Sequence, residues 1–416
     1  MQLLRRALTL SIGEAAARVL GIAAFALLAR VLSLPDFGTL SFAMSTALMV
    51  GVLIDMGQNS HLGRLVARDP DCASGSLSRV LLNKLGLGVL AAAGVAVVLS
   101  LLGFSTEEVG LVALMGVWAT VLSMLDSMRA VARATSLMAL DSAVNGLESL
   151  GRLAAIVVAW ALGSSVSGYA AAYVLEAIVA CVLFALALRR KTSIRLGIRR
   201  AIQSTGLLGK SWALGIMGMA MAGFYRVDQI VVQGFAGAAE NGLYGAATRV
   251  AFTASVGGSL VMMAAYPELS RAAVVSGRYP RVFRRTLVLS VGVGLAIGLV
   301  VLLAASPIVS TLYGGGFTGA VPLLRILSLV VVGNSLTLVG MYSASALGRE
   351  HRAVLLASVM IGVNLTANLV LVPRFGALGA AWVSAVGELI MAGGMLYLSA
   401  DVLFRGRIRK EDVVAC

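Results

Sequence analysis

Charged side chains are scarce in this chain of 416 residues. Only 12% of them are Asp, Glu, Lys or Arg, whereas 59% are hydrophobic; an ordinary soluble domain is about 25% charged. A globule this apolar could not cover its surface with polar groups, so lipid must be its solvent. Lipid cannot hydrogen-bond the backbone, which restricts spanning segments to helices or closed barrels. The apolar runs are long, unbroken and rich in Ala, Leu, Val and Gly, and therefore indicate helices.

Cysteine and histidine are also scarce. The three cysteines, Cys72, Cys181 and Cys416, lie far apart, which excludes a disulfide framework and a metal-binding spacing. The two histidines, His61 and His351, fall in basic loops. Because no nucleophile motif, metal cluster or phosphate-cradling glycine loop is evident, we predict neither a cofactor nor an enzymatic activity.

The charge that is present has a basic excess, with a formal net charge of +14. In a soluble protein this excess would suggest a nucleic-acid partner. Here no stretch interleaves aromatic and basic residues as single-strand-binding grooves do. Most basic residues lie between the apolar runs, so they predict membrane topology and contact with anionic lipid headgroups instead.

Twelve segments have the roughly 20 apolar residues that a helix needs to cross a bilayer. They cover residues 8–32, 38–59, 80–103, 109–128, 138–162, 166–188, 207–230, 241–266, 286–310, 320–346, 353–372 and 378–403. Alternate loops carry most of the basic residues, among them Arg64, Arg68, Arg129, Arg133 and those of 189–200 and 271–285. Basic loops face the cytoplasm, so we predict a multi-pass membrane protein with both termini inside.

The longest basic loop, about 189–206, divides the chain into halves that resemble each other. PDFGTLSFA (35–43) opens the second segment, and AENGLYGAA (239–247) opens the eighth. Similarly, 167–176 opens the sixth segment and 379–388 opens the twelfth, each ending in a glutamate. These matches predict two parallel six-helix lobes, residues 1–195 and 196–416. Repeat transporters bind their substrates between such lobes.

Three stretches of the sequence resemble a known family. NLTANLVLVPRFGALGAA (364–381) resembles the signature of the eleventh and twelfth helices in the multidrug/oligosaccharidyl-lipid/polysaccharide exporter superfamily. Residues 18–38, which end in RVLSLPDFG, resemble its polysaccharide branch, as do YRVDQI (225–230) and the following GLYGAA (242–247). The resemblance implies an all-α fold with two six-helix lobes around a central cavity that opens alternately to each side.

The resemblance also implies a substrate. Members of the polysaccharide branch flip polyprenyl-diphosphate-linked oligosaccharide repeat units to the outer leaflet, for O-antigen, capsule or exopolysaccharide assembly. The implied partners are therefore this lipid-linked glycan, membrane lipids, and polysaccharide polymerase and ligase machinery. A proton or sodium gradient would drive the transport.

Several charged residues fall inside the predicted spans, where an ion costs at least a few kcal/mol. Glu14 and Arg18 share one helix face because they are four residues apart, and Glu148 and Arg152 repeat this spacing. The other candidates are Glu176, Glu388, Arg226, Asp228 and Arg249. Lys84 and Arg325 lie near predicted span ends, from which we expect them to snorkel to the interface, and Asp55 is predicted to be a helix-end residue.

The arginines Arg18, Arg152, Arg226 and Arg249 are predicted to bind the diphosphate, because a guanidinium can donate bidentately to phosphate. The acids are predicted to couple transport to an ion gradient or to pair with arginine; they are Glu14, Glu148, Glu176, Asp228 and Glu388. One alternative is that the two Glu–Arg pairs only neutralise each other. Both roles are compatible, since a pair can exchange partners when substrate arrives.

Two other functions stay open. A multidrug or cation antiporter of the same superfamily would need an acidic or apolar cavity, whereas arginines and acids are about equally common in these spans. A membrane glycosyltransferase would need a sizeable outer loop with catalytic groups. The predicted outer loops are short, and Glu107-Glu108 is their only acidic pair.

Overall fold

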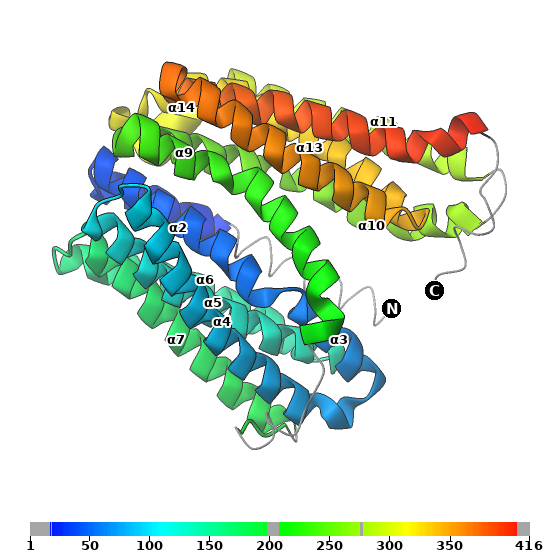
Figure 1. The fold of residues 1–416 in the computed structure, drawn as a ribbon, viewed down its shortest axis with the longest axis horizontal. Helices are drawn as coiled ribbons and strands as arrows, with labels where there is room; N and C mark the ends of the chain where they lie inside the picture. The colour runs from blue at the N-terminus through cyan, green and yellow to red at the C-terminus, as the bar shows by residue number, and fades with distance from the viewer. Residues whose placement is uncertain (1–16, 18, 193, 198–207, 275–277, 406–416) are drawn as a thin grey trace. The chain divides into compact units, whose positions relative to one another are not determined.

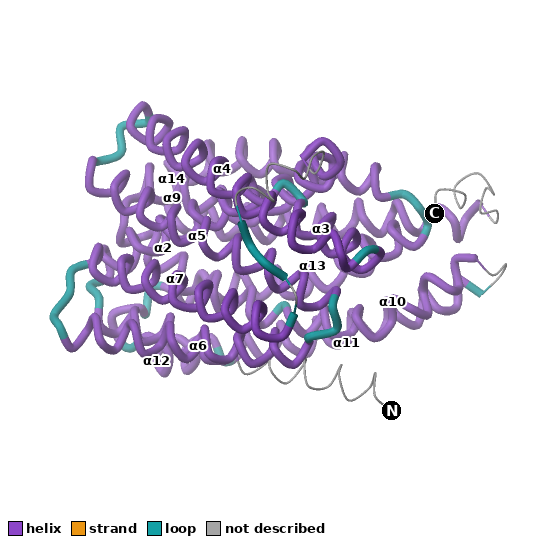
Figure 2. Tube along the Cα trace, turned by 90° about the horizontal axis from the view of Figure 1, so that it is seen from below, coloured by secondary structure: helices purple, strands orange, loops and turns teal. Residues whose placement is uncertain are grey.

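The structure, a computed structural model, describes residues 17, 19–192, 194–197, 208–274 and 278–405 (Figure 1). Throughout this part of the chain the regular elements are helices, and none is a strand (Figure 2). In the same residues nine helical stretches are long and apolar enough to cross a membrane. The prediction of an all-α, multi-pass membrane protein is confirmed.

Two of these nine stretches, Ala222–Ala273 and Glu350–Ser399, each overlap two predicted segments. The first is interrupted at Gly237 (φ 85°, ψ 173°) within α9 (Leu208–Ala254). The second is interrupted at Gly376 (φ 58°, ψ −143°) within α14 (Glu350–Arg405). Glycine adopts positive φ without steric cost, so each interruption separates two helical segments. A shorter apolar helix, Val19–Val31, lies in the first predicted segment.

The contacts around Gly237 show that the chain folds back on itself there. Asn241 donates to Gln233 at 3.2 Å, and Gln229 donates to Thr248 at 3.2 Å. Each bond joins a residue before Gly237 to one after it, and the pair farther from Gly237 in one segment is also farther in the other, which is the pattern of two antiparallel helices. The backbone N–H of Ala377 donates to Glu240 at 3.1 Å, so the break in α14 lies beside the break in α9.

The chain separates into two compact units, Met1–Ala222 and Gly223–Cys416. The lobe boundary at residues 195 and 196 stays a prediction. The helices of the first unit are α2 (Leu34–Asp55), α3 (Gln58–Arg68), α4 (Ala73–Leu101), α5 (Thr106–Ala134), α6 (Met138–Ala161) and α7 (Val166–Lys191), with a 3-10 turn, η1 (Pro70–Cys72). Helix α5 packs against α2, α3, α4, α6 and α7 and is the centre of this unit.

The second unit contains the later part of α9, α10 (Val256–Val274), α11 (Tyr279–Leu303), α12 (Ala305–Tyr313), η2 (Gly315–Phe317), α13 (Ala320–Ala346) and α14. Here α13 is central, because it packs against α10, α11, α12 and α14. Helices α5 and α13 contain the fourth and tenth predicted segments. The central helix therefore has the same place in both halves of the predicted repeat.

Close contact between α13 and α14 depends on Gly340. A Cβ atom there would lie 2.5 Å from the backbone carbonyl carbon of Met395, and small residues permit such close helix packing. We expect Gly340→Ala to lower the free energy of unfolding by about 1–3 kcal/mol, the usual cost of overpacking. Gly393→Ala on α14 is the matched control, since a Cβ there meets nothing within 4 Å. Equal thermal stability of the two variants in detergent would contradict this packing.

Candidate functional site

A carboxylate bridges two arginines in the first unit. The two side-chain oxygens of Glu148 on α6 accept separately, one from Arg152 and the other from Arg129. Arg152 lies one helical turn after Glu148, whereas Arg129 comes from α5. The side chain of Glu148 is only 6% exposed. The predicted Glu148–Arg152 pair is thus present, and a second arginine extends it.

Arg152 also faces an acid and an aromatic ring on α7. Its Nε lies 3.8 Å from Oε2 of Glu176, and its guanidinium carbon lies 5.9 Å from the centroid of the Tyr173 ring. Among the described residues, neither this Nε nor either carboxylate oxygen of Glu176 has a hydrogen-bond partner. The Arg152–Glu176 contact is therefore an ion pair without a hydrogen bond, and it leaves a donor available on Arg152.

Arg129 is placed differently from the prediction. Helix α5 continues to Ala134, six residues beyond the predicted end at 128, so Arg129 lies inside the helix and not in a loop. Besides Glu148, it faces Asp126 at 3.5 Å and Asp141 at 3.7 Å. The Asp126–Arg129 spacing of three residues was the sequence signal for a partly neutralised helical arginine.

Lys84 does not snorkel, and that prediction is wrong. Its side chain is fully buried on α4 and donates to Asp55 at 2.8 Å and to Asn59 at 2.9 Å. It also contacts both the backbone oxygen (2.7 Å) and the hydroxyl (2.8 Å) of Ser123. An ammonium has three donors and requires acceptors when buried, and α2, α3 and α5 provide them. Asp55 is the last residue of α2, as predicted.

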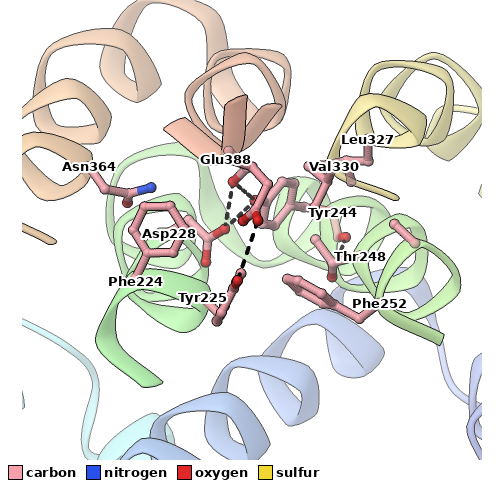
Figure 3. A pocket seen from close by; sticks show the side chains of 12 residues that line it. Phe224, Tyr225, Asp228, Tyr244, Thr248, Phe252, Leu327, Val330, Asn364 and Glu388 are labelled. Carbon is pink, nitrogen blue, oxygen red and sulfur yellow. Dashed lines mark hydrogen bonds between the residues drawn. The ribbon is translucent and has the colours of Figure 1, made fainter. Parts of the chain in front are cut away.

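The second unit contains a polar pocket built from α9, α13 and α14 (Figure 3). Its lining residues are Phe224, Tyr225, Asp228, Tyr244, Thr248, Ala251, Phe252, Leu327, Val330, Asn364, Ser384 and Glu388. Two predicted acids, Asp228 and Glu388, therefore meet in one pocket. The free space within it is about 10 Å³, roughly what a single water molecule needs, which suits a small ion or a water better than a lipid-linked glycan.

The two acids of this pocket have different surroundings. Asp228 accepts from the hydroxyl of Tyr244, from Ser384 at 3.1 Å and from the backbone N–H of Gln229 at 2.8 Å. These three donors stabilise an ionised carboxylate. The antiparallel pairing across Gly237 brings Tyr244 opposite Asp228.

Glu388 has fewer donors. Its Oε1 accepts from Thr337 at 2.7 Å and from Tyr225 at 3.5 Å, whereas its Oε2 has no hydrogen-bond partner among the described residues. The residue is only 1% exposed. The uncharged partners Tyr225, Tyr244 and Thr337 were missed by the sequence analysis, because a hydroxyl in an apolar run carries no distinctive pattern.

The remaining predicted residues lie elsewhere. Arg226 and Arg249 are half-buried on α9 and do not line the pocket. Glu14 and Arg18 lie outside the described residues. Within the described part of the chain, no three His, Cys, Asp or Glu side chains gather as metal ligands. The structure thus groups Glu148, Arg152 and Glu176 in one unit, and Asp228 and Glu388 in the other.

A protein-family model described as "Polysaccharide biosynthesis protein" matches residues 3–273. No curated protein matches the chain. Among solved structures, the fold is similar to the lipid II flippase MurJ in an inward closed conformation, with a TM-score of 0.74, 14% identity, and coverage of 97% of this chain and 90% of that one.

Two further solved structures are similar in fold. One is an inward-facing multidrug resistance MATE family transporter of the MOP superfamily, with a TM-score of 0.73, 16% identity and coverage of 96% of both chains. The other is a MOP superfamily transporter from Pyrococcus furiosus, with a TM-score of 0.60, 16% identity, and coverage of 97% of this chain and 96% of that one. At these identities the likeness establishes the fold alone, which this chain shares with these transporters.

Proposed function

The chain belongs to the polysaccharide biosynthesis protein family, and from this membership we propose that it is a lipid-linked oligosaccharide flippase. It moves polyprenyl-diphosphate-linked repeat units of O-antigen, capsule or exopolysaccharide from the inner to the outer leaflet of a bacterial-type cytoplasmic membrane. Both termini face the cytoplasm in this proposal. The fold shared with a lipid II flippase supports a lipid-linked cargo.

The position and surroundings of Arg152 are the observation that supports this proposal most directly. Its side chain lies in the middle of an apolar helix and is 18% exposed, with one nitrogen that has no hydrogen-bond acceptor among the described residues. A buried arginine is costly, and phosphate oxygens match the planar fork of donors that arginine presents. The diphosphate of the carrier would therefore replace Glu176 beside Arg152, while Glu148 continues to hold the other side of the guanidinium.

The other predicted arginines, Arg18, Arg226 and Arg249, belong to the same cationic path in this proposal. Translocation proceeds by alternating access and is coupled to a proton or sodium gradient. The acids Glu14, Glu148, Glu176, Asp228 and Glu388 are the candidates for binding the coupling ion or pairing with arginine. The polymerase and ligase of the glycan pathway would receive the product at the outer leaflet.

The alternative is a multidrug or cation antiporter, and the likeness in fold to a MATE family transporter supports this alternative. A cationic drug would have to compete with Arg129 and Arg152 for the carboxylates of the same cluster. Drug resistance that persists in cells without any glycan pathway would favour this alternative. Sugar transfer by the purified protein would instead favour a glycosyltransferase.

Depletion of the protein tests the proposed function in cells. We expect a polyprenyl-diphosphate-linked oligosaccharide to accumulate on the cytoplasmic leaflet, because its synthesis continues while its export stops. The measurement is extraction and mass spectrometry of lipid-linked intermediates before and after depletion. If no such intermediate rises while the surface glycan stays normal, the flippase assignment is wrong.

A further inference from the structure

Each unit contains a buried glutamate at the same place in the sequence repeat. Glu176 ends the stretch 167–176 and Glu388 ends the matching stretch 379–388. The side chain of Glu176 is 5% exposed, and Glu388 is 1% exposed. Within the described residues, at least one carboxylate oxygen of each lacks a hydrogen-bond donor. An ionised carboxylate in such a place costs several kcal/mol unless it is paired or protonated.

The charges around Glu176 leave one carboxylate in excess. Three guanidinium groups, those of Arg129, Arg133 and Arg152, face four carboxylates, which belong to Asp126, Asp141, Glu148 and Glu176. The side chain of Asp126 is 45% exposed, while Asp141 and Glu148 accept hydrogen bonds from arginines. Glu176 is the buried member of this cluster whose two oxygens both lack a hydrogen bond, so a proton that neutralises the cluster is most stable there.

The surroundings of Glu388 likewise favour a proton on this residue, in the second unit. Three titratable groups line the pocket with it: Asp228, Tyr225 and Tyr244. Asp228 has three donors and Arg226 as a nearby positive charge. Glu388 accepts from two hydroxyls, both of which contact one oxygen, and the amide of Asn334 lies close to the same group. Asp228 has the greater number of hydrogen-bond donors to stabilise an ionised carboxylate, so of the two acids Glu388 is the one that takes a proton more readily.

We propose that Glu176 and Glu388 are repeat-related proton-binding sites, so that the transporter carries two protons in each cycle, one in each unit. This inference rests on the proposed ion-coupled transport and selects the proton as the coupling ion. Protonation of Glu176 removes the charge that faces Arg152 and makes this arginine available to an anion. By linkage, an anion bound at Arg152 increases the proton affinity of Glu176 by the same factor.

Infrared spectroscopy of the purified, substrate-free protein tests this proposal. In an ester-free detergent at neutral pH, where exposed carboxyl groups are ionised, the C=O stretch of protonated carboxyl groups is measured with its shift in D₂O. We expect two bands in the unmodified protein, the loss of one in Glu176→Gln, the loss of the other in Glu388→Gln, and the loss of both in the double variant. Glu107→Gln, at an exposed helix start, should change nothing.

A second set of variants separates protonation from folding. Glu176→Asp and Glu388→Asp keep the carboxyl group and should keep a protonated band, and size-exclusion chromatography reports whether each variant remains monodisperse. Bands that survive both glutamine substitutions, or that disappear together in one single variant, would overturn the proposal. Because the assay contains no glycan, this failure would leave the flippase assignment to be decided by depletion.

Discussion

Arg152→Ala abolishes translocation of the lipid-linked glycan while the protein still inserts and folds. The substitution removes the guanidinium that we assign to the diphosphate, and a hydrogen bond to a charged partner contributes about 1.5–3 kcal/mol. Glu148 keeps Arg129 as a partner, so the buried cluster retains part of its charge balance. The measurement is surface polysaccharide in cells that express the variant at normal membrane level. Normal polysaccharide at normal expression would remove Arg152 from the substrate path.

A double variant distinguishes binding from neutralisation. If Arg152 only balances Glu176, then Arg152→Ala combined with Glu176→Gln removes both charges and should restore binding of the lipid-linked glycan to the purified protein, a readout that does not require proton transfer through Glu176. If Arg152 contacts the diphosphate, the double variant should still fail to bind it. We expect no binding by the double variant, and Arg152→Lys to retain a fraction of the affinity, because lysine keeps the charge but not the bidentate geometry.

Lys84→Met lowers the free energy of unfolding by about 3–5 kcal/mol, the cost of removing one partner from a buried ion pair. Asp55, Asn59 and Ser123 lose the ammonium that joins α2, α3 and α5 to α4. The measurement is thermal unfolding of the solubilised protein. Lys191→Met is the matched control, because Lys191 is exposed at the end of α7 and should cost less than about 0.5 kcal/mol.

The charge of Asp55 gives this prediction a second test. In Lys84→Met the carboxylate of Asp55 is left without its cation, so adding Asp55→Asn should recover part of the lost stability. Contacting residues are expected to show such coupling. A Lys84→Met variant as stable as Lys191→Met would mean that the ammonium network contributes nothing to the fold.

The membrane helices could be predicted from the sequence because lipid imposes long apolar runs on the chain. The breaks at Gly237 and Gly376 also fall between predicted segments, in the gaps 231–240 and 373–377. Both breaks need a glycine with positive φ, and glycine is visible in a sequence. The end of α5 was harder to predict. Basic residues such as Arg129 and Arg133 are typical of the loops between membrane helices, but here they lie in the last turns of the helix.

The partners of buried charges could be predicted only when they were local. Glu148 and Arg152 are one helical turn apart, and their pairing follows from helix geometry. Lys84 instead finds its partners between 25 and 39 residues away in the sequence. Whether a lysine near a helix end faces lipid or a neighbouring helix depends on the rotation of that helix. The apolar pattern of α4 does not specify this rotation, since hydrophobic residues lie on all sides of the helix.

Reconstitution tests the central claim most directly. The purified protein is placed in vesicles that contain a polyprenyl-diphosphate-linked oligosaccharide, and the fraction of glycan accessible to an external lectin or glycosidase is followed after a pH gradient is imposed. The flippase assignment predicts that accessibility rises with the unmodified protein and does not rise with Arg152→Ala. Equal accessibility in vesicles with unmodified protein, with the variant and without protein would contradict it.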